Sequence, residues 1–534
     1  MNDHTHTKRD SDMTALDPHR SSSNISTDSH PATITGVEAD AAVASKENRE
    51  GKTGADADPE IIVLDWEGPD DPGNPRNWSL VIKWRSAVIV SAFTFISTVS
   101  SSMIAPCSAQ LAEQWGITST VLLAMTTSVF ILAYCACSVG PLFLGPMSEL
   151  YGRSRVLQAS NMFYLAWNIG CGFAQSKNQL IAFRFLAGLG GSAPLSVGGG
   201  VLGDLFTAET RGQAIAIYSL APLLGPVIGP LTGAWVAEKS TWRWVFWSTS
   251  IVDAAVQVAG LFFLKETYPP VLLERRAARM RKSADIEKNV QIITVFQKTQ
   301  ARDWKSVFSK ALTRPFVMFM YEPIIQLLGV YMAFIYGLLY LFITTIPDIF
   351  ENTYGERVGI AGLNYLAFGV GLTGASQINA RLLDYIYRTL TKRRGGKGRP
   401  EYRLPSMVPG TILLPLGLFL TGWTARASVH WIVPDIGIAM VGAGVILNFQ
   451  AIQTYVIDAF TLHAASALAA VAFLRSICGF GFPLFAPTMY NALGYGKGDS
   501  ILGAVAIIIG CPAPYLFWVY GERIRKASKY AHKS

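Results

Sequence analysis

Apolar residues run in long stretches along this chain, and short polar segments separate them. Each stretch holds roughly 20 residues, which is the length that crosses a bilayer as a helix. We therefore predict an all-α membrane protein with twelve transmembrane helices in two six-helix bundles, residues 81–264 and 315–520. The spans are expected near residues 86–108, 120–144, 155–175, 178–202, 212–236, 243–264, 315–345, 358–380, 404–424, 429–457, 464–490 and 498–520.

Three polar segments lie outside the two bundles. Residues 1–80 are rich in Ser, Thr, Asp and His, which predicts a disordered cytosolic N-terminal tail. Residues 265–314 form a charged cytosolic linker, and residues 521–534 form a cytosolic C-terminal tail. Six spans, a linker and six more spans indicate two related halves around a central path, an arrangement associated with alternating access.

The basic residues indicate the orientation of the spans. The linker carries twelve Lys or Arg and the loop between spans eight and nine carries eight, whereas the alternate loops carry at most two each. By the positive-inside rule, both termini and the linker are cytoplasmic. We expect a multi-pass protein of the cell membrane, and a monomer. The net charge of +8 therefore reflects topology, and we expect no nucleic acid partner.

Span five contains prolines and glycines at four-residue spacing. The stretch APLLGPVIGPLTG, residues 221–233, places Pro226 and Pro230 beside glycines that recur on one helix face. Interior prolines cost about 3 kcal/mol each in a soluble helix, but neighbouring membrane helices can satisfy the freed carbonyl groups. We predict a bent helix with a smooth face against which another backbone packs closely. The glycines of this face are Gly225, Gly229 and Gly233.

Two further segments carry charge at informative positions. The loop between spans two and three contains Gly145, Glu149, Gly152 and Arg153, an acid four residues before an arginine between two glycines. This pattern predicts a charge-stabilised hinge, or else an ordinary basic loop. Arg184 lies six residues into span four. An intramembrane arginine indicates a function by default, although its side chain could instead snorkel to the surface.

These three segments, each in its expected span, together resemble the major facilitator superfamily. The loop resembles the signature of that superfamily, the Arg184 segment its second motif, and residues 221–233 the motif of proton-coupled antiporters. The second half, for example PEYRLP at 400–405, resembles the fungal branch of the twelve-helix drug:proton antiporter group. The chain departs from the pattern at Glu149, Leu150, Ser154 and Ala187. No equally clear copy of the loop motif stands between spans eight and nine.

A proton-coupled transporter needs a titratable group inside the membrane. We rank Glu322 first because it lies in a family-like part of span seven, where Pro323 would break the helix. Asp253 in span six and Asp435 in span ten are the other candidate acids. Each acid could instead be a structural partner of an arginine. The remaining candidates for the central cavity are Arg184, Arg475, Gln450 and Tyr336.

The resemblance implies an exporter of a small organic compound, a secondary metabolite or a drug-like xenobiotic, in exchange for protons. An organic-acid exporter, for example of an itaconate-like dicarboxylate, is an alternative that Arg184 and Arg475 motivate. A polyamine exporter would need the few acids of the spans. We expect no enzyme, because the seven histidines form no cluster and no nucleophile motif is present. No cofactor and no metal site are expected.

Overall fold

The structure is a computed structural model, and it describes residues 60–136, 140–207, 210–283, 290–296, 304–395, 398–460 and 463–528. Most of the expected N-terminal tail, residues 1–59, lies outside the described residues. So does the end of the C-terminal tail. Everything that follows concerns the unit that begins at Glu60.

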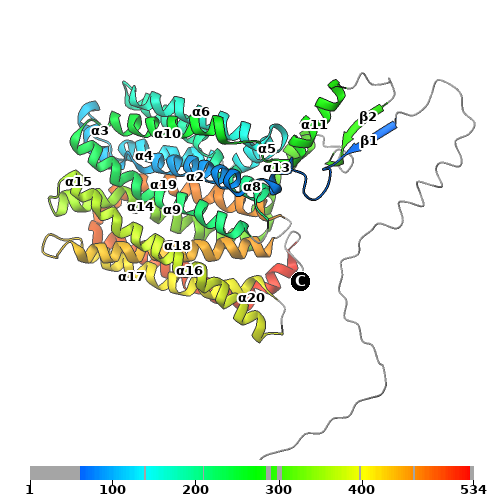
Figure 1. The fold of residues 1–534 in the computed structure, drawn as a ribbon. Helices are drawn as coiled ribbons and strands as arrows, with labels where there is room; N and C mark the ends of the chain where they lie inside the picture. Colours follow the sequence, from blue (N-terminus) through cyan, green and yellow to red (C-terminus); the bar gives the residue numbers. More distant parts are fainter. Residues whose placement is uncertain are drawn as a thin grey trace, which may run out of the picture. The chain divides into compact units, whose positions relative to one another are not determined.

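The first half is a set of helices that run side by side (Figure 1). Span four is divided between α7 and α8, and Pro194 stands in the first turn of α8. Proline suits a first turn because the amide hydrogen that it lacks would have no partner there. The helices are α2 (Leu80–Ser102), α3 (Ser108–Trp115), α4 (Thr120–Ala136), α5 (Gly140–Tyr151), α6 (Arg153–Gly172), α7 (Lys177–Gly191), α8 (Ala193–Leu205), α9 (Arg211–Lys239) and α10 (Arg243–Phe263).

The second half repeats this arrangement with longer helices. Its spans eleven and twelve join in α19, which is interrupted at Gly494 (φ +74°), and Pro512 then begins α20. A short 3-10 helix at Pro400–Met407 leads into α17. The helices are α13 (Trp304–Tyr321), α14 (Pro323–Asp348), α15 (Val358–Ala361), α16 (Tyr365–Arg393), α17 (Val408–Thr424), α18 (Ile432–Ala459), α19 (Ala464–Gly510) and α20 (Pro512–Ala527).

Within the described residues, nine helical stretches are long and apolar enough to cross a membrane. The stretch Ser466–Ala527 contains two of the expected spans, and the apolar part of α4 is a shorter helix, Thr120–Tyr134. The helix α6 is not among the nine, because amides such as Asn161 and Asn168 lower its hydropathy. The two amides are buried, so they face protein and not lipid.

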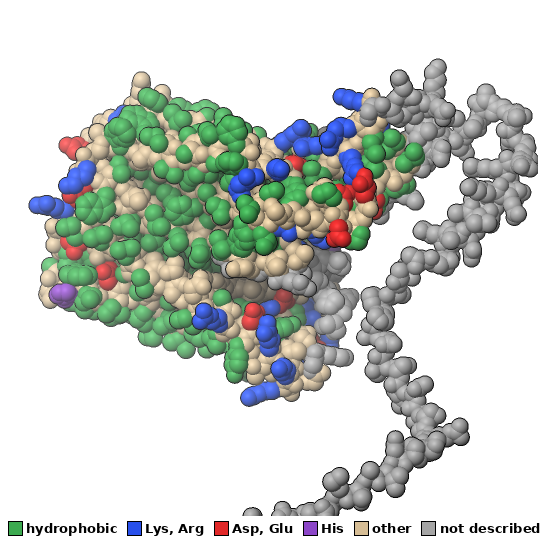
Figure 2. Space-filling model, viewed as in Figure 1, with side chains coloured by type: hydrophobic (Ala, Val, Ile, Leu, Met, Phe, Trp, Pro, Cys, Tyr) green, Lys and Arg blue, Asp and Glu red, His purple; other side chains and the backbone are tan. Residues whose placement is uncertain are grey.

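Hydrophobic side chains cover the middle of the face seen in Figure 2, and charged side chains gather toward its two ends. This is the surface that a bilayer requires. We call the end at which α11 (Pro269–Ser283) lies the linker end, and the opposite end, where α3 and α15 lie, the far end (Figure 1).

The two halves pack directly on each other. The helix α4 packs on α19, and α9 packs on α15 and α16. The largest cluster of buried apolar residues belongs mainly to the second half, but Ile131 and Val227 of the first half join it. At the far end, the backbone amide of Gly359 donates to Glu238 at 2.7 Å. In the middle, the hydroxyls of Ser101 and Tyr340 lie 3.2 Å apart.

Residues 60–78, which we call the strap, are ordered, unlike the expected disorder of residues 1–80. The strand β1 (Glu60–Leu64) pairs in parallel with β2 (Val290–Thr294) of the linker, with Ile62 opposite Ile292. Both strands are rich in isoleucine and valine, which favour extended structure. Neither strand was predicted, because each strand meets its partner only in the folded chain.

An acidic turn fastens the strap to α11. Arg276 of α11 forms ion pairs with Glu67 and with Asp71, the latter at 3.1 Å. Asp71 also accepts the backbone amides of Glu67 at 3.0 Å and Gly73 at 2.7 Å. These amide donors, together with Arg276, hold the pKa of the Asp71 carboxyl below its ordinary value.

Candidate functional site

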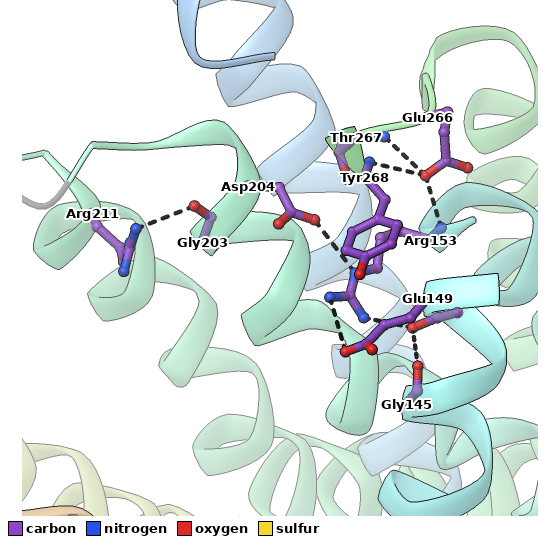
Figure 3. A network of polar contacts seen from close by, with 10 residues as sticks. Gly145, Glu149, Arg153, Gly203, Asp204, Arg211, Glu266, Thr267 and Tyr268 are labelled. Carbon is purple, nitrogen blue, oxygen red and sulfur yellow. Dashed lines mark hydrogen bonds and ion pairs between the residues drawn. The ribbon is translucent and has the colours of Figure 1, made fainter. Parts of the chain in front are cut away.

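Arg153 is the centre of a polar network at the linker end of the first half (Figure 3). Its guanidinium lies 3.3 Å from the carboxylate of Asp204, 3.9 Å from Glu149, and donates to the hydroxyl of Ser148 at 2.6 Å. The ring of Tyr268 lies 4.8 Å from its guanidinium carbon. The network therefore joins the start of α6, the end of α5, the end of α8 and the start of the linker.

Glu266 ties the same turn to the linker. Its carboxylate accepts the backbone amide of Arg153 at 2.8 Å and the amides of Thr267 and Tyr268 at 3.1 Å. Gly152 stands against this carboxylate with φ +105°, and a Cβ there would overlap the Glu266 oxygen. Glycine is thus required at 152 both by conformation and by space, whereas a Cβ at Gly145 would meet no atom within 4 Å.

The second half contains a similar network, in which an arginine meets two acids and a tyrosine ring. Arg403 donates to Asp458 at 2.9 Å and to Asp384 at 3.0 Å, and its guanidinium carbon lies 4.2 Å from the ring of Tyr387. Asp458 stands at the end of α18, as Asp204 stands at the end of α8. No loop motif in the sequence indicates this network, because Asp384 lies 19 residues before Arg403 whereas Glu149 lies four residues before Arg153.

Asp204, Glu266 and the second network were not predicted from the sequence. A spacing that recurs in the two halves of the sequence could have indicated both arginine–aspartate pairs. Arg153 and Asp204 are 51 residues apart and Arg403 and Asp458 are 55 apart, and each pair joins the start of one span to the end of the next.

The glycine face of span five packs on α2. A Cβ at Gly229 would lie 2.5 Å from the carbonyl oxygen of Val99, and Cβ atoms at Gly225 and Gly233 would approach Thr98 and Met103 more closely still. The helix α9 runs through Pro226 and Pro230 as one helix. The close seam predicted from the sequence is present.

The seam lies inside the first half, because α2 and α9 both belong to it. Contact with the second half is made by the opposite arrangement, in which glycines of the second half meet side chains of α9. A Cβ at Gly369 of α16 would lie 2.6 Å from Val227, and a Cβ at Gly362 would lie 2.5 Å from Ala234. The glycine face therefore does not itself seal one half against the other.

Arg184 is buried inside the first half with 1% of its surface exposed, so it does not snorkel. Its guanidinium donates to the carbonyl oxygens of Ser100 at 3.3 Å and of Ser101 and Thr127 at 3.1 Å. The rings of Phe130 and Phe246 flank it at 5.3 and 5.7 Å. Carbonyl groups and aromatic faces thus take the place of a carboxylate partner.

A line of contacts leads from Arg184 to the second half. Ser101, whose carbonyl oxygen binds Arg184, touches the hydroxyl of Tyr340 on α14. The ring of Tyr340 packs against Tyr336 with 5.2 Å between centroids, and the guanidinium carbon of Arg475 lies 4.7 Å from the Tyr336 ring. Three of the candidates, Arg184, Tyr336 and Arg475, therefore lie along one path that crosses between the halves.

The candidate Gln450 lies in the second half, outside this path. Gln450 of α18 donates to the hydroxyl of Ser376 at 2.7 Å and accepts from Asn379 at 2.9 Å. Both partners belong to α16. The contacts of Gln450 therefore join α16 to α18.

The three candidate acids lie in different places. Asp253 is fully buried in α10, where both carboxylate oxygens accept from Asn161 at 3.1 and 3.2 Å. Glu322 is buried at the linker end, between α13 and α14, where Pro323 does break the helix as predicted. Asp435 stands in the first turn of α18. Glu322 and Asp435 thus lie at the ends of helices, closer to the ends of their membrane spans than predicted from the sequence.

Comparison with known proteins agrees with this architecture. The family model described as Major Facilitator Superfamily matches residues 90–483. The efflux pump vrtL of Penicillium aethiopicum is 49% identical over 477 residues, which cover 89% of this chain and 92% of that protein. The efflux pump radE of Floropilus chiversii is 39% identical over 477 residues, which cover 89% of this chain and 87% of that protein.

Solved transporter structures share the fold. The xylose transporter XylE from E. coli, in a partially occluded inward open conformation, matches with a TM-score of 0.60 at 14% identity, over 82% of this chain and 98% of that chain. A bacterial homolog to the human lysosomal transporter Spinster, in an inward-facing and unoccupied conformation, matches with a TM-score of 0.58 at 14% identity, over 84% of this chain and 99% of that chain. The predicted fold class, twelve helices in two bundles, is confirmed.

Proposed function

Because this chain belongs to the major facilitator superfamily, as its motifs suggested, we propose that it exports a small organic compound across a membrane in exchange for protons. Relatives that are named efflux pumps support export. The observation that carries the proposal is the path from Arg184 to Arg475, which places polar and charged groups where the two halves meet.

The distribution of hydrogen bonds between the halves supports alternating access. Hydrogen bonds join the halves at the far end, through Glu238 and Gly359, and in the middle, through Ser101 and Tyr340. The Arg153–Asp204 and Arg403–Asp458 pairs each lie within one half at the linker end. Each half can therefore move as a body while its own network keeps its helices together.

We assign the proton to Asp253 ahead of Glu322 and Asp435. Its carboxylate accepts from the amide of Asn161, which also donates to Gln257 at 2.8 Å. A carboxylate in a low-dielectric interior costs several kcal/mol as an anion unless a cation compensates it. An acid of this kind gains and loses its proton as its surroundings change, which a proton carrier needs.

The remaining parts of the proposal concern setting and cargo. We place the protein in the plasma membrane as a monomer with both termini and the linker in the cytoplasm, which the basic loops support. The cargo is a secondary metabolite or a xenobiotic.

The test compares cells with and without this protein. Mass spectrometry of cell extract and medium should show a compound that accumulates inside the deletion strain, and a protonophore should reproduce that accumulation in the wild type. Asp253→Asn should behave as the deletion, whereas Asp435→Asn, the matched control at a helix end, should export normally. Unchanged partition of every compound in the deletion strain would overturn the proposal, and normal export by Asp253→Asn would overturn the proton assignment alone.

A further inference from the structure

We propose that the cargo is an organic anion with an aromatic body, and that the guanidinium of Arg475 binds its anionic group. This inference rests on the proposed function, because it names the class of compound that the exporter carries. It depends on the contacts of Arg475, on the places of the acids, and on the position of the cluster between the halves.

Arg475 presents a cation between aromatic rings. Its guanidinium carbon lies 4.7 Å from the ring of Tyr336 on α14 and 5.4 Å from the ring of Phe449 on α18. The Nε atom is buried and has no hydrogen-bond partner among the described residues. Aromatic faces attract a cation by about 0.5–2 kcal/mol, but they accept no hydrogen bond of ordinary strength from its five N–H groups.

No carboxylate is within ion-pair distance of Arg475 in the part of the chain that the structure describes. The three candidate acids lie elsewhere: Asp253 binds Asn161 in the first half, Glu322 lies at the linker end, and Asp435 lies in the first turn of α18. A cation inside the membrane without a counter-charge is costly. The protein therefore leaves the place of the counter-ion to a ligand.

Among the described residues, Arg184 also lacks a carboxylate partner, and its Nε is likewise buried without a hydrogen-bond partner. It differs from Arg475 because three backbone carbonyl oxygens accept from its two NH2 groups and because it is 1% exposed. Arg475 is only partly buried, so its guanidinium is within reach of a ligand. Of the two arginines on the path, Arg475 is the anion site.

The position of Arg475 suits a transported ligand. One turn further along α19, a Cβ at Gly479 would lie 3.0 Å from Tyr336 and 3.2 Å from Ile131 of the first half. Tyr336 in turn packs on Tyr340, which touches Ser101 of the first half. A ligand stacked on Tyr336 would thus contact both halves, and an aromatic ligand would match the rings that surround the guanidinium.

The test uses the full-length protein in lipid nanodiscs and 2-naphthoate as the probe. Isothermal titration should show that 2-naphthoate binds about 10- to 100-fold more tightly than neutral 2-naphthamide, the range that a charge-assisted hydrogen bond supplies. Arg475→Gln should remove this preference, and Arg475→Lys should restore part of it, because lysine keeps the charge but not the planar fork. The matched control is Arg426→Gln, because Arg426 also lies over a ring, that of Trp423 at 5.4 Å, and should leave the preference intact.

Several outcomes would overturn the inference. Equal affinity for naphthoate and naphthamide in the wild type would refute an anion site, and an unchanged preference in a folded Arg475→Gln protein would refute the residue. Competition by chloride as effective as that by naphthoate would show a site for inorganic ions. Failure of the proposed function is seen separately, since export by cells tests the exporter and titration tests the anion site.

Discussion

The packing of α9 on α2 makes a quantitative prediction for Gly229→Ala. The new Cβ would lie 2.5 Å from the carbonyl oxygen of Val99 and 2.6 Å from the hydroxyl of Ser102. Ordinary van der Waals contact begins at 3.4 Å, so one helix must move by about 0.9 Å (3.4 − 2.5). A gap of that size forfeits a quarter to a half of the dispersion energy of each contact that it opens.

Two effects of opposite sign contribute to the stability of this variant. Forcing an extra methyl group into a packed interface costs about 1–3 kcal/mol. Replacing glycine by alanine in a helix interior gains about 1 kcal/mol. Gly374→Ala in α16 isolates the second effect, because a Cβ there meets no atom within 4 Å. The difference in unfolding free energy between the two variants, about 1–3 kcal/mol, therefore measures the packing cost alone.

The assay is equilibrium unfolding of the purified protein in bicelles by titration with dodecyl sulfate. Gly229→Ala should unfold at a lower detergent fraction than the wild type, and Gly374→Ala at an equal or higher one. If both alanine variants unfold together, the glycines of α9 are not there to permit close approach, and the packing explanation is wrong.

Three further predictions concern the linker end. Gly152→Ala should lower the thermal stability of the purified protein by more than Gly145→Ala does, because only the first meets Glu266 and has a positive φ; equal melting temperatures would contradict this. Arg403→Gln should slow export without abolishing expression, since it removes the partner of two aspartates. Export rates are compared at matched protein levels, and an unchanged rate would contradict this. The pKa of Asp71 is lowered in the folded protein. Its contribution to stability is therefore complete above the ordinary pKa of 3.8 and is lost as the pH falls through the lower folded value. Hydrogen-exchange protection of the strap, corrected for intrinsic rates, should be constant from about pH 8 to about pH 5 and should fall only below about pH 4.

The spans were predictable because their signal is local. A run of apolar residues specifies a membrane helix without knowledge of its neighbours, and Pro323 marks the end of a helix by its own chemistry. Hydropathy alone does not identify α6 as a membrane span. Asn161 and Asn168 make this helix polar, and only its position between helices of the first half explains why the amides are tolerated.

The contacts of the candidate site were not predictable, because they join distant parts of the chain. Glu266 meets Arg153 across 113 residues, and Ser101 meets Tyr340 across 239. The sequence singled out Arg475 and Tyr336 but could not place them together. Nor could it tell that Asp435 lies at a helix end, since that depends on where α18 begins.

The parallel pairing of β1 with β2 has a consequence for synthesis of the protein. Leu64 leaves the ribosome about 226 residues before Val290 (290 − 64), which at 5–20 residues per second is roughly 10–45 s. During that time a short apolar strand must wait without its partner while the six spans of the first half are inserted. The strands β1 and β2 can pair only after these spans have been synthesised. Pairing of the strap with the linker therefore follows completion of the first half.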